Sequence, residues 1–214
     1  PIAKKAIDEG YYVHLLTEIT TKRKEIEKYG IVVEEIKFKR GSTSILRNLF
    51  LFIKILKIFK SINPNLIHLV TIKPVILGGI AAHFLGKSVK LVMSISGLGF
   101  IFIDKGIKAF FRKIIIIFFY KLVFIKKNIK VILQNKTDLQ NICDFTNLDR
   151  EKTILIEGSG VNLNQFKFSK VPLTKPIVLF PARLLSSKGI YEFIDAAKNL
   201  RGKARFVIVG KHDL

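Results

Sequence analysis

The residues best suited to chemistry lie in the stretch 181–189, which reads Pro-Ala-Arg-Leu-Leu-Ser-Ser-Lys-Gly. It follows the apolar run Ile177–Phe180, which predicts a strand, and it leads into a helical pattern from Gly189. Ligands of parallel sheets bind beyond the carboxyl ends of strands, and helix N-termini attract phosphate. Arg183 has a planar guanidinium, a planar fork of N–H donors that can form two hydrogen bonds to phosphate oxygens, and Lys188 has a compact positive charge. Together they are suited to binding a diphosphate. The alternative is a solvated basic loop, which is ordinary in so basic a chain.

A second candidate is the stretch Ser96-Gly97-Leu98-Gly99, which follows the predicted strand Leu91–Ile95. Gly97 and Gly99 would let the backbone approach a ligand closely, although they also fit a plain tight turn. Lys73 follows the predicted strand Leu66–Val70 and is the candidate for contacting a phosphate of the acceptor. His68 lies within that strand and reads as a core histidine. No histidine has a partner at ligand spacing, so we expect no metal site.

These stretches need an alternation of strands and helices to position them. The strands are short continuous apolar runs, which are typical of strands covered on both faces in a parallel sheet. Helical patterns separate them throughout, which predicts a doubly wound α/β fold. Helices are predicted at 1–9, 21–29, 44–62, 74–85, 106–125, 137–145 and 189–200, and strands at 11–17, 31–38, 66–70, 91–95, 131–133, 154–156, 177–180 and 205–209.

The alternation is interrupted once. Residues 169–176 have no periodicity and contain two prolines, as a linker does. We therefore expect a first Rossmann-like domain over 1–168, with its first strand missing, and the truncated start of a second over 177–214.

Composition limits the classes of partner. The chain has 214 residues, 37 Lys+Arg against 16 Asp+Glu, and a formal net charge of +21. This excess favours anionic partners, although biased composition explains it equally well. The basic residues are interleaved with apolar runs, unlike a nucleic-acid arm, so we expect no nucleic acid. Cys143 is the only cysteine, which fits a cytoplasmic setting.

Two helical patterns combine basic and apolar faces. On the stretch 105–127 a helical wheel gathers most cations in one sector, and the stretch 47–60 shows the same division. Such helices lie in the interface of anionic membranes, although a core-facing stripe with a solvated basic face gives the same pattern. The candidate membrane residues are Lys105, Lys108, Arg112, Lys113, Lys126 and Lys127.

Several motifs resemble one enzyme family. The residues Phe180-Pro181-Ala182-Arg183, Lys188-Gly189 and Phe193–Ala197 look like the donor-diphosphate motif of the family-4 retaining glycosyltransferases. The stretch Leu155–Asn162, followed by Phe166, resembles the loop that precedes their interdomain linker, with Asn162 where Asp is more frequent. Thr71–Pro74 and Ser96–Gly99 resemble a subgroup that builds lipid-linked surface polysaccharides and oligosaccharides.

The resemblance implies a GT-B fold, in which two Rossmann-like domains face across a cleft. It implies transfer of a hexose-type sugar from a nucleoside diphosphate, with UDP the expected carrier, to a lipid-linked acceptor at the inner face of the cell membrane. It gives no resident cofactor. The resemblance implies that the donor is bound by Arg183, Lys188 and Gly189. It assigns Lys73, Gly97 and Gly99 to the acceptor side of the cleft, and Gly158, Ser159, Gly160 and Asn162 to the interdomain loop.

The family's acidic donor-binding pair is expected beyond Leu214, so we expect the chain to be inactive alone, and the catalytic residues stay unassigned. The alternative function is non-catalytic: a remnant or split subunit that binds a membrane or a partner protein through its basic helices. An acidic pair downstream of Leu214 would distinguish the enzyme from that alternative.

Overall fold

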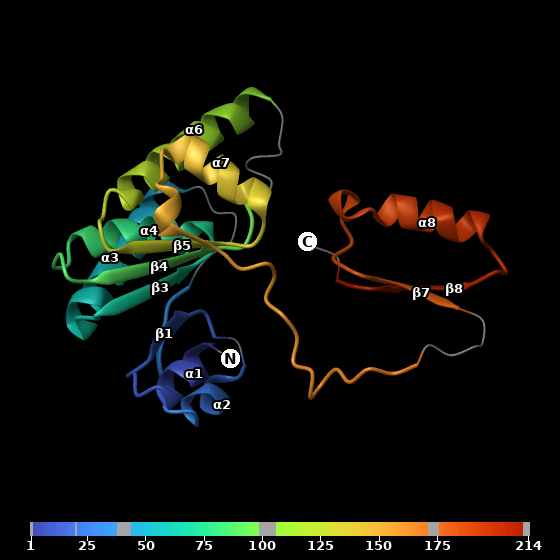
Figure 1. Ribbon diagram of the computed structural model, residues 1–214, viewed down its shortest axis with the longest axis horizontal. Coiled ribbons are helices and arrows are strands. Elements are labelled where there is room, and N and C mark those ends of the chain that lie inside the picture. The colour runs from blue at the N-terminus through green and yellow to red at the C-terminus, as the bar shows by residue number, and fades with distance from the viewer. Residues whose placement is uncertain (1, 20, 38–43, 99–105, 171–175, 212–214) are drawn as a thin grey trace. The chain divides into compact units, whose positions relative to one another are not determined.

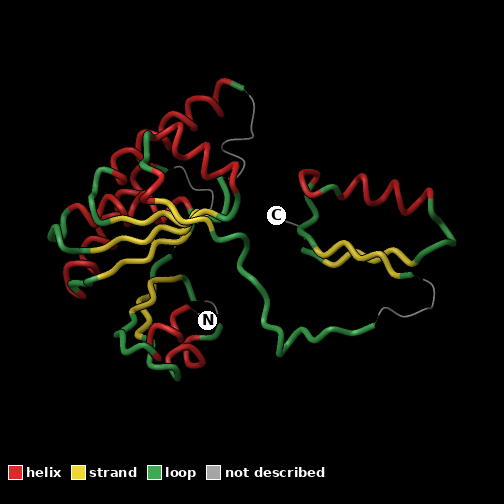
Figure 2. The backbone as a smooth tube through the Cα atoms, in the orientation of Figure 1, coloured by secondary structure: helices red, strands yellow, loops and turns green. Residues whose placement is uncertain are grey.

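The computed structural model describes residues 2–19, 21–37, 44–98, 106–170 and 176–211 of the chain (Figure 1). Helices and strands alternate along these residues, and every strand pair that they form is parallel (Figure 2). The predicted α/β class with parallel sheets is therefore confirmed. The chain divides into two compact units, Pro1–Ser159 and Gly160–Leu214.

The large unit contains two separately hydrogen-bonded sheets. The smaller sheet pairs β1 with β2, and the larger has the order β3-β4-β5-β6. The strands are β1 (His14–Thr17), β2 (Val32–Glu35), β3 (Leu66–Val70), β4 (Lys90–Ile95), β5 (Ile129–Leu133) and β6 (Thr153–Leu155). The helices are α1 (Ile2–Asp8), α2 (Arg23–Glu27), α3 (Ile45–Ile62), α4 (Ile72–His83), α6 (Ile107–Phe124), α7 (Lys136–Thr146) and the short 3₁₀ helix η1 (Arg150–Lys152).

One face of the four-stranded sheet forms the core of the large unit. Alternate residues along each strand point to this face, because successive strand side chains point to opposite faces. Figure 1 shows α6 and α7 together on one side of this sheet. The strand residues buried in the core are Ile67, Leu69, Leu91, Met93, Ile95, Ile129, Val131 and Leu133.

Two adjacent glycines bring α4 close to its neighbours. A Cβ atom on Gly78 would lie 2.6 Å from Cδ2 of Leu69 on β3. A Cβ atom on Gly79 would lie 2.5 Å from Cγ1 of Val123 on α6. Real Cβ atoms do not approach so closely, so a larger residue at Gly78 would displace the end of the Leu69 side chain, and at Gly79 it would collide with the stiffer Val123; α4 therefore lies close to both the sheet and α6.

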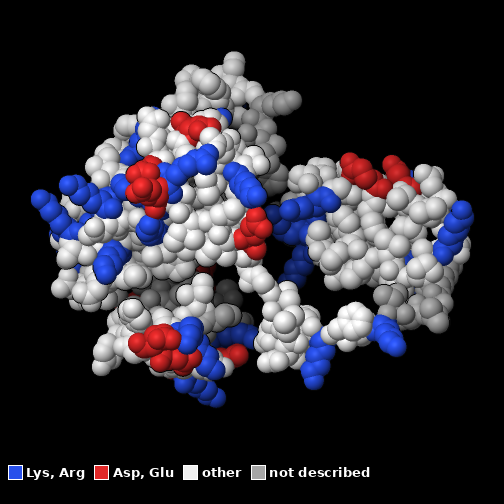
Figure 3. Space-filling model, in the orientation of Figure 1, with Lys and Arg blue, Asp and Glu red and all other residues white. Residues whose placement is uncertain are grey.

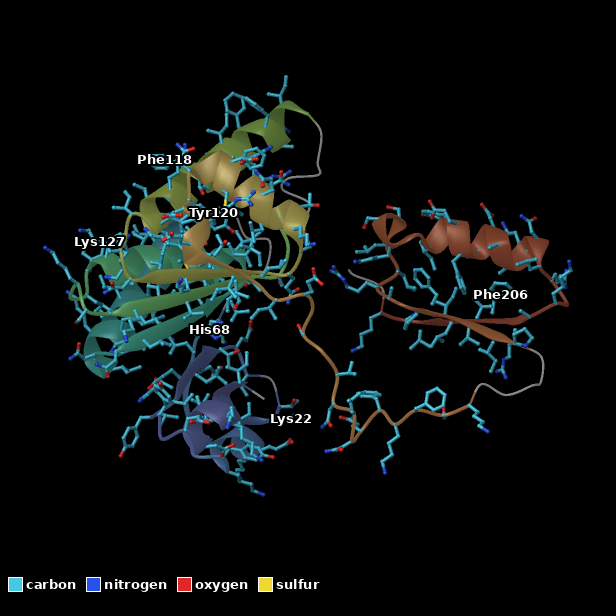
Figure 4. The ribbon with its side chains drawn as sticks, in the orientation of Figure 1. Lys22, His68, Phe118, Tyr120, Lys127 and Phe206 are labelled. Atoms are coloured by element: carbon cyan, nitrogen blue, oxygen red, sulfur yellow. The ribbon has the colours of Figure 1, made fainter. Side chains whose placement is uncertain are left out.

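The small unit has a strand–helix–strand arrangement. Its elements are β7 (Ile177–Pro181), the 3₁₀ helix η2 (Ser186–Lys188), α8 (Ile190–Asn199) and β8 (Arg205–Val209). Phe193 of α8 packs on the strands, with its ring centroid 5.1 Å from that of Phe180 and 5.6 Å from that of Phe206. Figure 4 shows Phe206 between the β7–β8 pair and α8.

Most predicted elements are confirmed, with shifts at their ends. The strands Leu66–Val70 and Arg205–Val209 agree with the sequence prediction, whereas β1 and β2 are shorter than predicted. Helix α4 begins at Ile72 and not at Pro74, because proline is tolerated throughout a first helical turn, where no N–H donor is needed. Residues 171–175 of the predicted linker lie outside the described residues, and the predicted domain limits remain a prediction.

Candidate functional site

The candidate donor residues lie together in the small unit, at the carboxyl end of β7. Arg183 follows this strand by two residues, and Lys188 ends η2 immediately before Gly189. Both side chains are exposed. Gly189 has a left-handed φ of 80°, a conformation that glycine adopts without strain, and its carbonyl accepts a bond from the N–H of Phe193 at 3.0 Å. It is thus the N-cap of α8, and it lacks a side-chain cap.

The loops after β7 and β8 press against each other. A Cβ atom on Gly210 would lie 1.9 Å from the carbonyl oxygen of Ala182. The N–H of Leu184 donates to the carbonyl of Lys211 at 3.2 Å. The residues on either side of Arg183 in the sequence therefore contact residues 210 and 211, which fixes the backbone of this loop at the edge of the sheet where ligands of parallel sheets bind.

In the large unit, Lys73 occupies the second position of α4, directly after β3. It is half-buried, and burial is the larger cause of a lowered pKa of its ammonium. The second cause is the positive charge of Arg47, in the first turn of α3. The charge of Arg47 therefore acts on Lys73 although the two residues lie on different helices, α3 and α4.

The turn between β3 and α4 is strained. Thr71 has a φ of 72° and a ψ of 163°, although its side chain is β-branched. This region of backbone space is almost restricted to glycine and costs about 1 to 3 kcal/mol. The Thr71 N–H donates to the carbonyl of Ser94 at 3.1 Å, which ties the turn to β4. Strain of this kind persists at functional sites, which supports a role for the turn that carries Lys73.

His68 lies on the opposite face of β3 from the core (Figure 4). Its Nε2 lies 2.7 Å from the hydroxyl oxygen of Ser94 on β4. Burial lowers the pKa of His68, because it disfavours the charged form of the ring. The prediction of a core histidine is wrong as to its place, because His68 is half-buried on the other face of the strand, but its ring does have a hydrogen-bonding neighbour.

The remaining acceptor-side residues follow β4. Gly97 is half-buried two residues beyond this strand, near the strand end to which Thr71 bonds. Gly99 lies outside the described residues. The acceptor-side assignment of Lys73, Gly97 and Gly99 remains a prediction.

The loop after β6 is exposed along its length. Gly158 and Gly160 have left-handed φ values of 77° and 67°. Ser159 accepts a hydrogen bond from Nε2 of Gln134 at 3.4 Å. The Asn162 side chain accepts from the N–H of Asn164 at 3.0 Å and closes a local turn. These contacts are structural, and no ligand contact is assigned to the loop.

The basic residues predicted to face a membrane fall into different environments. Nζ of Lys126 donates to the carbonyls of Ala82 and Gly86, at 3.3 and 3.4 Å, and so binds the end of α4. Nζ of Lys113 lies 4.0 Å from the centre of the Phe145 ring on α7. Lys108, Arg112 and Lys127 are exposed, and Lys105 lies outside the described residues. Figure 3 shows Lys and Arg spread over both units, with small groups of Asp and Glu between them.

Within the described ranges, no group of three or more His, Cys, Asp or Glu side chains is placed to hold a metal ion. No helix there is long and apolar enough to cross a membrane.

Two features of the large-unit site were not predicted from the sequence, although Thr71 begins the motif Thr71–Pro74 that was noted there. Arg47 was grouped with the basic face of its helix, and its proximity to Lys73 depends on the packing of α3 against α4. Thr71 carries the strained turn, which residue type does not indicate. A β-branched residue disfavours a positive φ, so nothing in the residue type at Thr71 signals this strain.

The sequence of the chain is similar to those of known proteins. A family model described as "Glycosyl transferase 4-like" matches residues 1–135. Over the whole chain, 30% identity is found to a Campylobacter jejuni protein named N,N'-diacetylbacillosaminyl-diphospho-undecaprenol alpha-1,3-N-acetylgalactosaminyltransferase. The chain covers 59% of that relative.

Two solved structures share the fold. A glycosyltransferase from Rickettsia africae matches 98% of the chain with a TM-score of 0.65 and 22% identity. Sucrose-phosphate synthase from Thermosynechococcus elongatus matches 99% with a TM-score of 0.68 and 18% identity. The chain covers 55% of each, so it spans a little over half the length of these proteins.

Proposed function

Because this chain belongs to the glycosyl transferase 4-like family and has a GT-B-like α/β fold, we propose that the protein transfers a sugar from a nucleoside diphosphate to a lipid-linked glycan acceptor. The observation that carries the proposal is the family match together with the basic loop beyond β7. The lipid-linked acceptor is supported by the Campylobacter relative, whose name specifies an undecaprenol diphosphate acceptor.

The proposed donor is a UDP-linked hexose-type sugar, transferred with retention of configuration. The relative's name specifies an N-acetylgalactosaminyl group, which supports a hexose-type donor. Retention and the UDP carrier rest on the resemblance of the motif at 180–197. The proposal includes no resident cofactor, because the nucleotide sugar is a substrate.

Arg183 and Lys188 have the proposed role of holding the donor diphosphate. Negative charge accumulates on this leaving group as the bond to the sugar breaks, so fixed cations stabilise the transition state more than the ground state. No side-chain cap is bound at the start of α8, so the first backbone N–H groups of this helix would donate to phosphate oxygens, next to the carboxylate of Glu192 in the same turn. Lys73 and Arg47 have the corresponding role toward a phosphate of the acceptor.

The proposed location is the inner face of the cell membrane, where the lipid-linked acceptor is met. The exposed cations Lys108 and Lys127 would be attracted to anionic lipid headgroups. This attraction is screened within about 10 Å at roughly 0.1 M salt.

A transfer assay tests the proposal. The intact protein is incubated with a panel of UDP- and GDP-sugars and a diphospho-undecaprenol glycan, and the lipid product is detected by mass spectrometry. We expect a mass increase of one hexose-type residue with a UDP-sugar. Absence of any product across the donor panel, with a folded protein and a verified acceptor, would contradict the proposal.

A further inference from the structure

Helix α6 has two apolar faces. The inner face packs into the core through Ala109, Tyr120, Val123 and Phe124, all of which are buried. The outer face carries a second set of large apolar side chains, which the described residues leave exposed. We call this set the α6 stripe, and it consists of Ile107, Phe110, Phe111, Ile114, Ile115, Phe118, Leu122 and Ile125.

The stripe is continuous along the helix. Its members recur at steps of three and four residues, which places them on one side of a helix with 3.6 residues per turn. Figure 4 shows Phe118 on the outer side of α6 and Tyr120 on the side toward the sheet. Exposures run from 36% for Leu122 to 78% for Ile107. A helix that is apolar on both faces needs a second apolar environment.

The charged residues of α6 indicate which apolar environment covers the α6 stripe. The sequence of α6 contains no Asp or Glu, and the exposed residues Lys108 and Lys121 border the stripe. Two copies of a chain with a net charge of +21 would bring these cations together without an acidic partner, which disfavours self-association through the stripe. An apolar phase beneath an anionic surface matches both the stripe and its border.

We infer that α6 lies in the plane of an anionic membrane, with the stripe inserted at the boundary between headgroups and acyl chains. The bordering lysines lie at headgroup level, where their stems extend along the apolar surface. This inference goes beyond the proposed transfer reaction, because it needs neither donor nor acceptor. It also differs from attraction by the basic face alone, since insertion persists when salt screens the charges.

The first test uses vesicle flotation of the 214-residue chain, without any sugar nucleotide. Vesicles contain phosphatidylglycerol mixed with phosphatidylcholine, or phosphatidylcholine alone, in low salt and in about 1 M salt. Wild-type chain should stay bound to the anionic vesicles in high salt. Since each exposed phenylalanine contributes about tenfold on insertion, the double variant Phe110→Ser/Phe118→Ser should bind on the order of 100-fold more weakly.

Matched controls separate insertion from other effects. Phe166, at 62% exposure, matches Phe110 at 61% but lies outside the stripe, so Phe166→Ser should bind as wild type does. Lys108→Gln/Lys121→Gln should weaken binding to anionic vesicles in low salt only. Circular dichroism checks that each variant is folded.

Fluorescence gives an independent measurement, because the chain has no tryptophan. Phe118→Trp introduces a single reporter, whose emission should shift to the blue with vesicles and be quenched by brominated acyl chains. Phe166→Trp should show neither change. Three results would overturn the inference: full release of wild-type chain in high salt, wild-type binding by the double phenylalanine variant, or a dimer in solution that the same variant dissociates.

Discussion

The glycine at the crossing of α4 and α6 provides the sharpest test of how the large unit is packed. In Gly79→Ala, the new methyl group would lie 2.5 and 2.8 Å from the two Cγ atoms of Val123 and 3.2 Å from its Cβ. Val123 is fully buried, and its β-branched side chain has essentially one rotamer in a helix, so it cannot turn away. The two helices must therefore move apart.

The magnitude follows from two opposing effects. Overpacking of a well-packed core costs about 1 to 3 kcal/mol, and we expect a cost toward the upper end because the new methyl group would collide with both methyl groups of Val123. Alanine in place of glycine returns up to about 1 kcal/mol of helix propensity. We expect a net loss of about 1 to 2 kcal/mol in the free energy of unfolding. For a chain of this size the melting temperature should fall by about 2 to 8 °C.

Thermal unfolding followed by circular dichroism measures the change. Gly86→Ala is the matched control, because the nearest atom to its Cβ would be the Ser88 hydroxyl oxygen at 3.8 Å. Adding Val123→Ala to Gly79→Ala should remove the clash, so the double variant should lose less stability than the sum of the single losses. A Gly79→Ala chain that melts at or above the wild-type temperature would refute this account of the α4–α6 contact.

Four further predictions concern buried and basic residues. The Tyr120 hydroxyl has no hydrogen-bond partner among the described residues, so Tyr120→Phe should raise the free energy of unfolding at pH 7 by about 1 kcal/mol in urea titration. Burial raises the pKa of the Tyr120 hydroxyl above its ordinary value of 10.0, so the unfolded chain loses this proton at a lower pH than the folded chain does. The free energy of unfolding should therefore fall above pH 10, and it should fall less steeply in Tyr120→Phe. Arg183→Ala and Lys188→Ala in the intact protein should each lower kcat/KM on the order of 100-fold, and Arg183→Lys should not fully restore it because the planar fork is lost; wild-type kcat/KM in both alanine variants would remove the donor-site assignment. Arg47→Gln should raise the pKa of Lys73, detected by the pH dependence of its chemical modification, because a neighbouring positive charge is removed.

The strand–helix order was predictable because both periodicities are local. A short apolar run bounded by Gly, Pro or Asn predicts a strand such as β3 from local residues alone, independently of the tertiary contacts that the strand makes. The ends were less predictable, since β1 and β2 depend on pairing with each other and not on their own residues alone.

The two faces of α6 could not be separated from sequence. A helical wheel groups its cations, but both the core face and the exposed face are rich in Ile and Phe. Contact with Gly79 selects the face that contains Val123 as the inner one, and this contact joins residues far apart in the chain. The position of Lys126 has the same origin, because it binds carbonyls at the end of α4 and not solvent.

The strained turn and the paired cations of the acceptor-side region were likewise out of reach of pattern analysis. The left-handed φ of Thr71 occurs where its N–H donates to the carbonyl of Ser94, on the neighbouring strand. The approach of Arg47 to Lys73 is set by the packing of α3 on α4. Sequence patterns specify elements, whereas these features arise where elements meet.

The chain path connects the proposed membrane face to the proposed acceptor side. Gly97 lies at the end of β4, and Ile107 begins α6 ten residues later. Lys73 lies on α4, which packs against α6 through Gly79 and Val123, so we expect a helix α6 held at headgroup level to keep Lys73 near the depth of a lipid-linked diphosphate. In the intact protein, Phe110→Ser/Phe118→Ser should then raise the KM for a long-chain lipid acceptor in vesicles while leaving the KM for the nucleotide sugar unchanged. With a short-chain, water-soluble acceptor the same variant should behave as wild type, because membrane binding no longer concentrates the substrate. An equal loss with both acceptors would mean that the variant disturbs the site itself, and the proposed separation between membrane attachment and acceptor binding would be wrong.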